Sequence, residues 1–283
     1  MEKHKMKMAI IGHGFVGKAV DYGFSSSKIE KFIIDPKYGT KIEDLAYKDI
    51  DITFVCVPTP MKDDGDIDSS IVEDCVHYLK QNVSGYIVIK STVTPVILDK
   101  FINCISATRI VYNPEFLMEK SANEDFVNPP MHIFGGSLEA THGVERVYNE
   151  YSLCKPCPVY HMSAVEASLV KYGINTFLAT KVAWFNQFYD MVERFGGNYG
   201  TVIRGITTDK RVGPSHTTVP GFDGKRGFGG ACFPKDSAAF LKLSEHSFSI
   251  LDEAIRVNND LRKEYEKDSR EKDQNVNYNI KYK

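Results

Sequence analysis

Short apolar runs alternate with longer amphipathic stretches over roughly the first 160 residues of this 283-residue chain. The apolar runs have the length and β-branched content of buried strands, and the stretches between them have helical periodicity. The alternation predicts an α/β fold built on a parallel sheet. The expected strands are residues 8–11, 31–34, 52–57, 86–89, 109–112, 133–134 and 159–161.

Helices are expected between these strands and throughout the remainder of the chain. Ser70 and Glu73 have the spacing of a capping box, and Pro95 stands where proline is favoured at a first helical position. Residues 164–194 predict one long helix that ends at Gly196-Gly197. A shorter helix is expected at 199–205, and a last helix at 237–268. Residues 207–234 are rich in Gly, Pro and Thr and predict a long loop, of a length that is usually either functional or disordered. The final ten residues are expected to fray.

A glycine-rich turn follows the first predicted strand. Gly12, Gly14 and Gly17 form G-x-G-x-x-G at the start of a helix, and Asp35 ends the second strand 18 residues after Gly17. Such glycines permit a tight turn and close approach of a pyrophosphate to a helix N-terminus, and a carboxylate at this spacing can bind ribose hydroxyls and repel a 2′-phosphate. The sequence therefore predicts a Rossmann-type doubly wound sheet that binds NAD, in residues 1–162, followed by an all-helical dimerisation domain in residues 163–283.

Composition narrows the function classes. The formal net charge of -2 argues against a nucleic-acid binder, and no run of about 18 apolar residues suggests a membrane span. The first eight residues lack the features of a signal peptide, so a cytoplasmic protein is expected. Six cysteines in this length do not indicate a disulfide framework, and no metal site is predicted. Cys56, Cys75 and Cys104 are interpreted as core residues.

Two cysteine motifs have different interpretations, one structural and one catalytic. Cys154 and Cys157 form a lone C-x-x-C that is read as a surface turn, since a zinc site needs two more ligands and only His161 stands near. Cys232 lies in Gly-Phe-Gly-Gly-Ala-Cys-Phe-Pro-Lys-Asp, which starts at Gly227. The glycines allow close backbone approach and positive φ, and a nearby lysine favours the reactive thiolate. Cys232 is therefore the candidate nucleophile.

Five further segments accompany this decapeptide in a fixed order. They are Val55 to Pro60 (V-C-V-P-T-P), Lys90 to Val93 (K-S-T-V), Asn113 to Glu119 (N-P-E-F-L-M-E), Lys171 to Asn175 (K-Y-G-I-N) and Arg211 to Gly213 (R-V-G). Together the six segments resemble the motifs of the UDP-glucose/GDP-mannose dehydrogenase family, and the resemblance covers nearly the whole chain.

The resemblance implies an NAD-dependent oxidoreductase of polysaccharide biosynthesis that converts the primary alcohol of a nucleotide sugar to a carboxylate through two hydride transfers. The implied catalytic residues are Cys232, Lys171, Asn175, Asp236, Glu115 and Thr92. The implied cofactor-binding residues are Gly12, Gly14, Phe15, Val16, Gly17, Asp35, Pro58, Thr59, Thr92, Glu119 and Lys235. The implied substrate-binding residues are Glu115, Phe116, Leu117, Lys171, Asn175, Arg211 and Gly229.

Residue chemistry suits these roles. Lys171 and Asn175 are one helical turn apart, so both project from one face and can stabilise an oxyanion beside Cys232. Either Lys171 or a water held by Asp236 can help the alcohol proton to leave, and Glu115 or Asp236 can activate the water that hydrolyses a thioester. Arg211 resembles an arginine that reaches the substrate of a neighbouring subunit, and a homodimer through the helical domain is expected.

The sequence departs from the family pattern in two places. The family has a third, C-terminal domain that closes over the nucleotide. No counterpart of this domain is seen in the sequence. Residues 215–225 are longer than the usual link, and His216 stands where an aromatic residue is common. Two alternatives remain open: a single-oxidation β-hydroxyacid dehydrogenase, which needs a lysine but no cysteine, and a catalytically idle protein that binds NAD or a nucleotide sugar.

Overall fold

A computed structural model describes residues 5–102 and 108–280. Cys104 lies outside these ranges. The chain forms two compact units, and the division between them falls inside a helix, between Lys171 and Tyr172. The N-terminal unit comprises residues 1–59 and 69–171, and the C-terminal unit comprises residues 60–68 and 172–283. Within the described ranges, no helix is long and apolar enough to cross a membrane.

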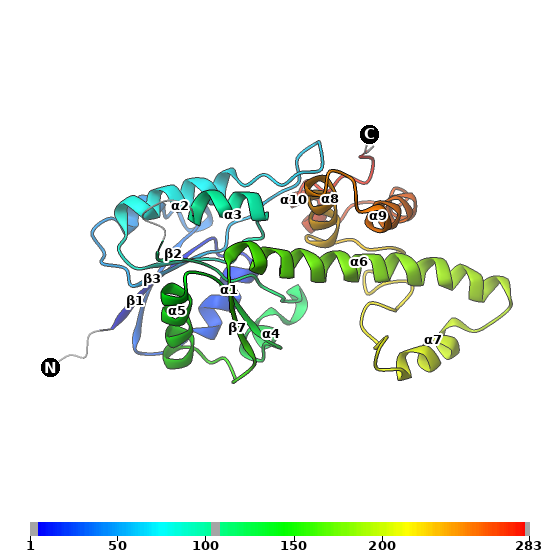
Figure 1. The fold of residues 1–283 in the computed structure, drawn as a ribbon, viewed down its shortest axis with the longest axis horizontal. Coiled ribbons are helices and arrows are strands. Elements are labelled where there is room, and N and C mark those ends of the chain that lie inside the picture. The colour runs from blue at the N-terminus through cyan, green and yellow to red at the C-terminus, as the bar shows by residue number, and fades with distance from the viewer. Residues whose placement is uncertain (1–4, 103–107, 281–283) are drawn as a thin grey trace. The chain divides into compact units, whose positions relative to one another are not determined.

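The N-terminal unit is built on one sheet, shown with its helices in Figure 1. The described strands follow the order β2-β1-β3-β4-β5-β6-β7. Their bounds are β1 Met6–Ile11, β2 Ile29–Ile34, β3 Ile52–Val55, β4 Tyr86–Ile89, β5 Ile110–Tyr112, β6 His132–Gly136 and β7 Val159–Met162. All seven overlap the ranges expected from the apolar runs. Strands β3 and β5 are buried along their whole length, as expected of strands covered on both faces.

One strand pair corrects the expectation of a parallel sheet. Strands β5 and β6 pair antiparallel, with Val111 opposite Gly136, whereas every other neighbouring pair in this sheet is parallel. The chain between β5 and β6 contains the short helices η3 (Glu119–Ser121) and α4 (Ala122–Val127). It enters β6 from the carboxyl edge of β5, so β6 must run in the opposite direction.

Helices cover both faces of this sheet, as expected of a doubly wound fold. Figure 1 places α2 (Ser70–Asn82) and α3 (Pro95–Ile102) on one face, and α1 (Phe15–Gly23), α4 and α5 (Leu138–Tyr151) on the other. Short 3-10 turns η1 (Pro36–Tyr38) and η2 (Ile42–Leu45) follow β2. The core between the sheet and α1, α4 and α5 contains an aromatic cluster of Phe24, Phe54, Phe126, Phe134 and Tyr148. Proline does open α3, as its position in the sequence predicted.

The predicted capping box at Ser70 is wrong. Ser70 is the first residue of α2, and Ser69 occupies the N-cap position. The Ser69 hydroxyl donates to Glu73 Oε1 at 2.5 Å, and the Ser69 side chain does not cap the helix N–H groups.

The C-terminal unit is helical. The long helix α6 (Ala164–Arg194) has the bounds that the sequence predicted, and α7 (Tyr199–Thr208) extends three residues further than expected. The expected single helix over 237–268 is wrong, because α8 (Phe233–Leu243) and α9 (Ser249–Arg262) are separate. Glu245 and His246 adopt positive φ values of 50° and 59° between them, which ends a right-handed helix.

The C-terminal segment also corrects an expectation. The short helix α10 (Ser269–Asp273) opens with a capping box between Asp268 and Glu271. Val276 and Tyr278, which lie in the region expected to fray, are buried. Residues 60–68 belong to the same unit, where Met61 N–H donates to the carbonyl of Gln274 at 2.9 Å. The chain after α9 is therefore packed rather than extended from the unit.

Candidate functional site

The carboxyl edge of the sheet carries most of the predicted cofactor residues of the N-terminal unit. Strands β1, β3, β4 and β5 are neighbours in the sheet and run in one direction, so the loops that follow them meet at one edge. Ligands of open α/β sheets bind at this edge. The predicted residues on these loops are Gly12, Gly14 and Gly17 after β1, Pro58 and Thr59 after β3, Thr92 after β4, and Glu115, Phe116 and Leu117 after β5.

The geometry of the glycine turn requires glycine. Gly12 has φ +85°, and a Cβ added there would lie 2.7 Å from the carbonyl oxygen of Cys56. A Cβ on Gly17 would overlap the carbonyl of Gly12, so only glycine lets α1 pack this closely on the turn. Phe15 and Val16 open α1, Gly14 is its N-cap, and no side chain caps the helix. Helix N–H groups therefore remain available to phosphate oxygens at this end.

Asp35 lies beyond the end of β2, where the sequence predicted a ribose-binding carboxylate. Its two oxygens accept backbone N–H groups from His13 at 2.6 Å and Lys37 at 2.9 Å. Burial would raise the pKa of Asp35, but these two hydrogen bonds outweigh burial and lower it. The carboxylate is therefore charged at neutral pH beside the glycine turn, which suits ribose hydroxyls and disfavours a 2′-phosphate.

A buried ion pair joins two predicted catalytic residues of the N-terminal unit. Lys171 Nζ donates to Glu115 Oε1 at 3.0 Å and to the Glu115 carbonyl at 2.6 Å. The side chains are only 3% and 6% exposed. Glu115 Oε2 in turn accepts the N–H of Leu117, and the Lys171 ammonium lies over the ring of Phe116. The loop after β5 is thus fixed against the first turns of α6.

A second polar group at this edge was missed by sequence reasoning. Lys90 Nζ donates to Asn113 Oδ1 at 2.9 Å, and the Tyr148 hydroxyl donates to the same oxygen at 2.7 Å. Burial lowers the pKa of Lys90 to about 8, and the nearby Lys171 charge acts in the same direction. Lys90 and Asn113 stand in two of the segments quoted above, and their position directly after buried strands was the available signal.

The C-terminal unit contains the other predicted catalytic group. Cys232 is the N-cap of α8, and Asp236 lies one turn into this helix. Asp236 Oδ2 accepts from Asn175 Nδ2 at 2.6 Å, and its Oδ1 accepts from Lys235 Nζ at 2.6 Å. The residues Asn175, Lys235 and Asp236 are all buried. The Lys235 ammonium, which the sequence suggests as a charge that favours the thiolate, forms an ion pair with Asp236.

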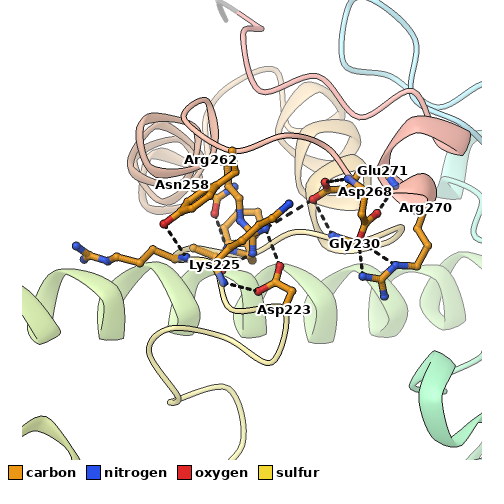
Figure 2. A network of polar contacts seen from close by, with 12 residues as sticks. Asp223, Lys225, Gly230, Asn258, Arg262, Asp268, Arg270 and Glu271 are labelled. Carbon is orange, nitrogen blue, oxygen red and sulfur yellow. Dashed lines mark hydrogen bonds and ion pairs between the residues drawn. The ribbon is translucent and has the colours of Figure 1, made fainter.

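The glycine-rich loop that leads to Cys232 rests on a buried polar network, shown in Figure 2. Arg262 on α9 donates to the carbonyl of Gly227 at 2.9 Å and to Asp223 at 2.7 Å. Glu271 Oε1 on α10 accepts the N–H of Gly230 at 3.2 Å. Gly227 and Gly230 have positive φ, as the sequence predicted. A Cβ on Gly229 would overlap the Arg262 and Glu271 side chains, so this glycine is required for packing.

Other predicted residues lie apart from these groups. The Arg211 side chain is 89% exposed and forms an ion pair with Asp209 at 2.6 Å. Glu119 begins the 3-10 turn η3, so it does not share a helical face with Glu115. Cys154 Sγ donates to the carbonyl of Phe126 at 3.1 Å, which fits a structural role.

A doubly wound sheet with a glycine turn after its first strand defines the class of dinucleotide-binding α/β proteins. Comparison with known proteins narrows this class. The NAD-binding domain of the UDP-glucose/GDP-mannose dehydrogenase family matches residues 37–152, and that family's central domain matches residues 165–260. The chain belongs to the UDP-glucose/GDP-mannose dehydrogenase family, and its cofactor is NAD. The matched residues begin after the glycine turn, so the turn is assigned by its own geometry.

Individual relatives agree with this assignment. A UDP-glucose 6-dehydrogenase of Rickettsia typhi is 32% identical over 228 residues, which are 77% of this chain and 51% of the relative. UDP-glucose 6-dehydrogenase TuaD of Bacillus subtilis is 30% identical over 297 residues, covering 89% of this chain and 62% of the relative. The chain therefore spans between about half and three fifths of the length of these two relatives.

Solved structures support the fold. A UDP-glucose dehydrogenase of Pyrobaculum islandicum has 26% identity and a TM-score of 0.75, over 91% of this chain and 68% of that one. A 3-hydroxyisobutyrate dehydrogenase of Mycobacterium tuberculosis has 15% identity and a TM-score of 0.66, over 88% of this chain and 91% of that one. At that identity the second likeness concerns the fold alone.

Proposed function

We propose that this chain takes part in the NAD-dependent oxidation of the primary alcohol of a nucleotide sugar to a carboxylate, with Cys232 as the covalent catalyst. The observation that carries the proposal is the buried group behind Cys232, in which Asn175 and Lys235 hold Asp236 from both sides. Three polar side chains buried together one turn from a cysteine suit a reaction centre better than a structural core. UDP-glucose is the first candidate substrate because the relatives quoted above carry that name.

NAD, when bound, accepts a hydride in each of two oxidations. The open N-terminus of α1 and the glycines before it suit its pyrophosphate, and Asp35 suits its ribose. We assign Pro58, Thr59, Thr92, Glu119 and Lys235 to the remainder of the cofactor site on the family resemblance. These residues provide binding and orientation, whereas the redox chemistry belongs to the cofactor.

The first oxidation converts the alcohol to an aldehyde, so a proton must leave the hydroxyl as the hydride departs. Lys171 donates to the Glu115 carbonyl and to Glu115 Oε1, so its ammonium suits the stabilisation of an oxyanion better than the removal of a proton. A water held by Asp236 is then the better proton acceptor. Asn175 offers an amide N–H that is already oriented by Asp236.

The second oxidation proceeds on Cys232. Its thiolate attacks the aldehyde carbon, and the oxygen takes up a proton to give a thiohemiacetal. Loss of the carbon-bound hydrogen as a hydride, and of the hydroxyl proton, leaves a thioester. Water then cleaves the C–S bond, releasing the carboxylate and restoring the thiol, with Glu115 or Asp236 as the base that activates the water. Covalent attachment retains the aldehyde between the two hydride transfers.

We assign the sugar-nucleotide contacts to Glu115, Phe116, Leu117, Arg211 and Gly229 on the same resemblance, together with Lys171 and Asn175. The Arg211 side chain is exposed, which suits contact with the substrate of a second subunit. Phe177, Trp184 and Met191 are exposed at intervals of seven residues along α6, where they form an apolar stripe. Such a stripe is typical of a helix that packs against a second helix, so we propose a homodimer through this face.

The test counts NADH formed per UDP-glucose consumed by the full chain, by Cys232→Ser and by the matched control Cys157→Ser. We expect two equivalents and equal rates for the native chain and the control, and turnover reduced by at least ~10³-fold in Cys232→Ser. One equivalent that Cys232→Ser leaves unchanged indicates a single-oxidation dehydrogenase. NAD binding without NADH from UDP-glucose or from other UDP- and GDP-sugars indicates a catalytically idle protein.

A further inference from the structure

Two histidines and a glutamate that have no part in the proposed reaction converge in the N-terminal unit. His142 and Glu145 lie on α5, and His161 lies on β7, the last strand of the sheet. His142 Nδ1 and His161 Nε2 are 3.3 Å and 3.2 Å from the same carboxylate oxygen, Glu145 Oε2. We propose that these three side chains bind a divalent transition-metal cation, with zinc as the preferred ion.

The donor types and their spacing support this site. Imidazole nitrogen and carboxylate oxygen are ordinary zinc ligands, at about 2.0–2.2 Å from the metal. A tetrahedral ion with bonds of this length holds neighbouring donor atoms roughly 3.3–3.4 Å apart. The two histidine–glutamate separations already have this value, and all three donor atoms lie within 4.8 Å of one another. Only the two imidazoles must approach each other, and their ring centroids are 4.1 Å apart.

Local structure places the donors without strain. His142 and Glu145 are three residues apart on α5, so both project from one face of the helix. That face packs near β7, which brings His161 opposite them. The exposed fractions of the side chains are 50% for His142, 25% for Glu145 and 16% for His161. Three protein ligands with one side open to solvent leave a fourth position for water, and the half-exposed His142 ring has room to rotate.

The ring of His161 has one nitrogen toward Glu145 and one toward the interior of the unit. Its other ring nitrogen, Nδ1, is buried and has no hydrogen-bond partner among the residues that the structure describes. The Glu145 carboxylate faces Nε2, so the proton of a neutral ring moves from Nε2 to Nδ1 when Nε2 presents its lone pair to a cation. The C-x-x-C motif does not contribute, since Cys154 Sγ is bonded to the Phe126 carbonyl.

The site would link an edge strand to the helix that precedes it. Among the strands that the structure describes, β7 pairs only with β6, and residues 152–158 connect it to α5 without regular structure. A metal bound to Glu145 and His161 closes this connection, which lowers the entropy of the opened strand. The consequence is stabilisation of the N-terminal unit rather than participation in hydride transfer.

The experiment uses the full chain after treatment with a chelator, titrated with Zn²⁺ against a competing zinc dye. The variants are His142→Gln, Glu145→Gln and the control His77→Gln, which replaces an exposed histidine on α2 that contacts Gln81. We expect one zinc ion per chain in the native protein and in the control. Each ligand variant should bind that ion at least ~10-fold more weakly.

Two spectroscopic measurements identify the ligands of the bound ion. Co²⁺ in place of zinc should give the visible bands of a tetrahedral nitrogen and oxygen site, without the ultraviolet charge-transfer bands of a thiolate ligand. In the native chain, Zn²⁺ should shift the NMR signals of two histidine rings, a result that needs no variant to fold. Equal zinc affinity in all four proteins, a thiolate spectrum, or no binding would overturn the proposal.

Discussion

Replacing Glu271 by alanine tests whether the segment after α9 supports the cysteine loop. Glu271 is 2% exposed, and its carboxylate accepts the N–H of Gly230 at 3.2 Å and the hydroxyl of Tyr278 at 2.7 Å. It also accepts the N–H of Asp268 at 2.9 Å in the capping box. Burial, and secondarily the Glu271 charge, raise the pKa of Tyr278 well above its usual value, so this hydroxyl remains a donor.

The expected loss in the free energy of unfolding follows from the hydrogen-bond donors that Glu271→Ala leaves without an acceptor. Two donors, the half-buried N–H of Gly230 and the buried hydroxyl of Tyr278, lose their acceptor, at about 1–3 kcal/mol each. The Arg262 guanidinium, 3.8 Å from the carboxylate, also loses part of its counter-charge, although Asp223 remains at 2.7 Å. Glu271→Ala should therefore lower the free energy of unfolding by about 3–5 kcal/mol. Glu271→Gln keeps one acceptor oxygen and should lower it by about 1–2 kcal/mol.

The assay is urea unfolding followed by tryptophan fluorescence. The chain has one tryptophan, Trp184, and it lies in the same compact unit as Glu271, so its emission reports unfolding of that unit. Glu266→Ala is the matched control, because this nearby side chain is 88% exposed and should change stability by less than about 0.5 kcal/mol. Glu271→Ala should also speed thiol labelling of Cys232, two residues after Gly230. A loss no larger than that of the control would refute the reasoning.

Three further predictions address the N-terminal unit and the thiols. Burial lowers the pKa of His132 to about 4, so its NMR titration should fall near that pH. The unfolded chain takes up this proton near pH 6.5. The neutral His132 therefore contributes to the free energy of unfolding above pH 6.5, and this contribution is lost as the pH falls to about 4. An NMR titration of His132 near pH 6.5 would contradict the prediction. Gly17→Ala should abolish detectable NADH fluorescence enhancement, because its Cβ would overlap the Gly12 carbonyl; unchanged binding would show that the turn is not the cofactor site. Burial raises the pKa of Cys56 to about 12, so at pH 8 a thiol reagent should modify Cys56 more slowly than Cys232, although both thiols are partly exposed; equal rates in peptide mass mapping would contradict this.

Local sequence determined the elements whose signals lie within a few residues. The seven strands follow from short apolar runs, and α6 follows from an uninterrupted helical period that ends before two glycines. The glycine turn and the positive φ of Gly227 and Gly230 were also predictable, because only glycine adopts such conformations without cost. Where a residue's backbone conformation and its type are coupled, the sequence is informative by itself.

The remaining features depend on contacts between residues far apart in the chain. Nothing local indicated that Glu245 and His246 would break the last helix, or that β6 would run antiparallel to β5. The pairing of Lys171 with Glu115 and of Asn175 with Asp236 spans 56 and 61 residues. The sequence suggests His161 only as a nearby zinc ligand for Cys154 and Cys157, and the structure places it beside His142 and Glu145 instead. The sequence determines the chemistry of each side chain. Only the folded chain determines which groups are buried together and therefore which charges must be paired.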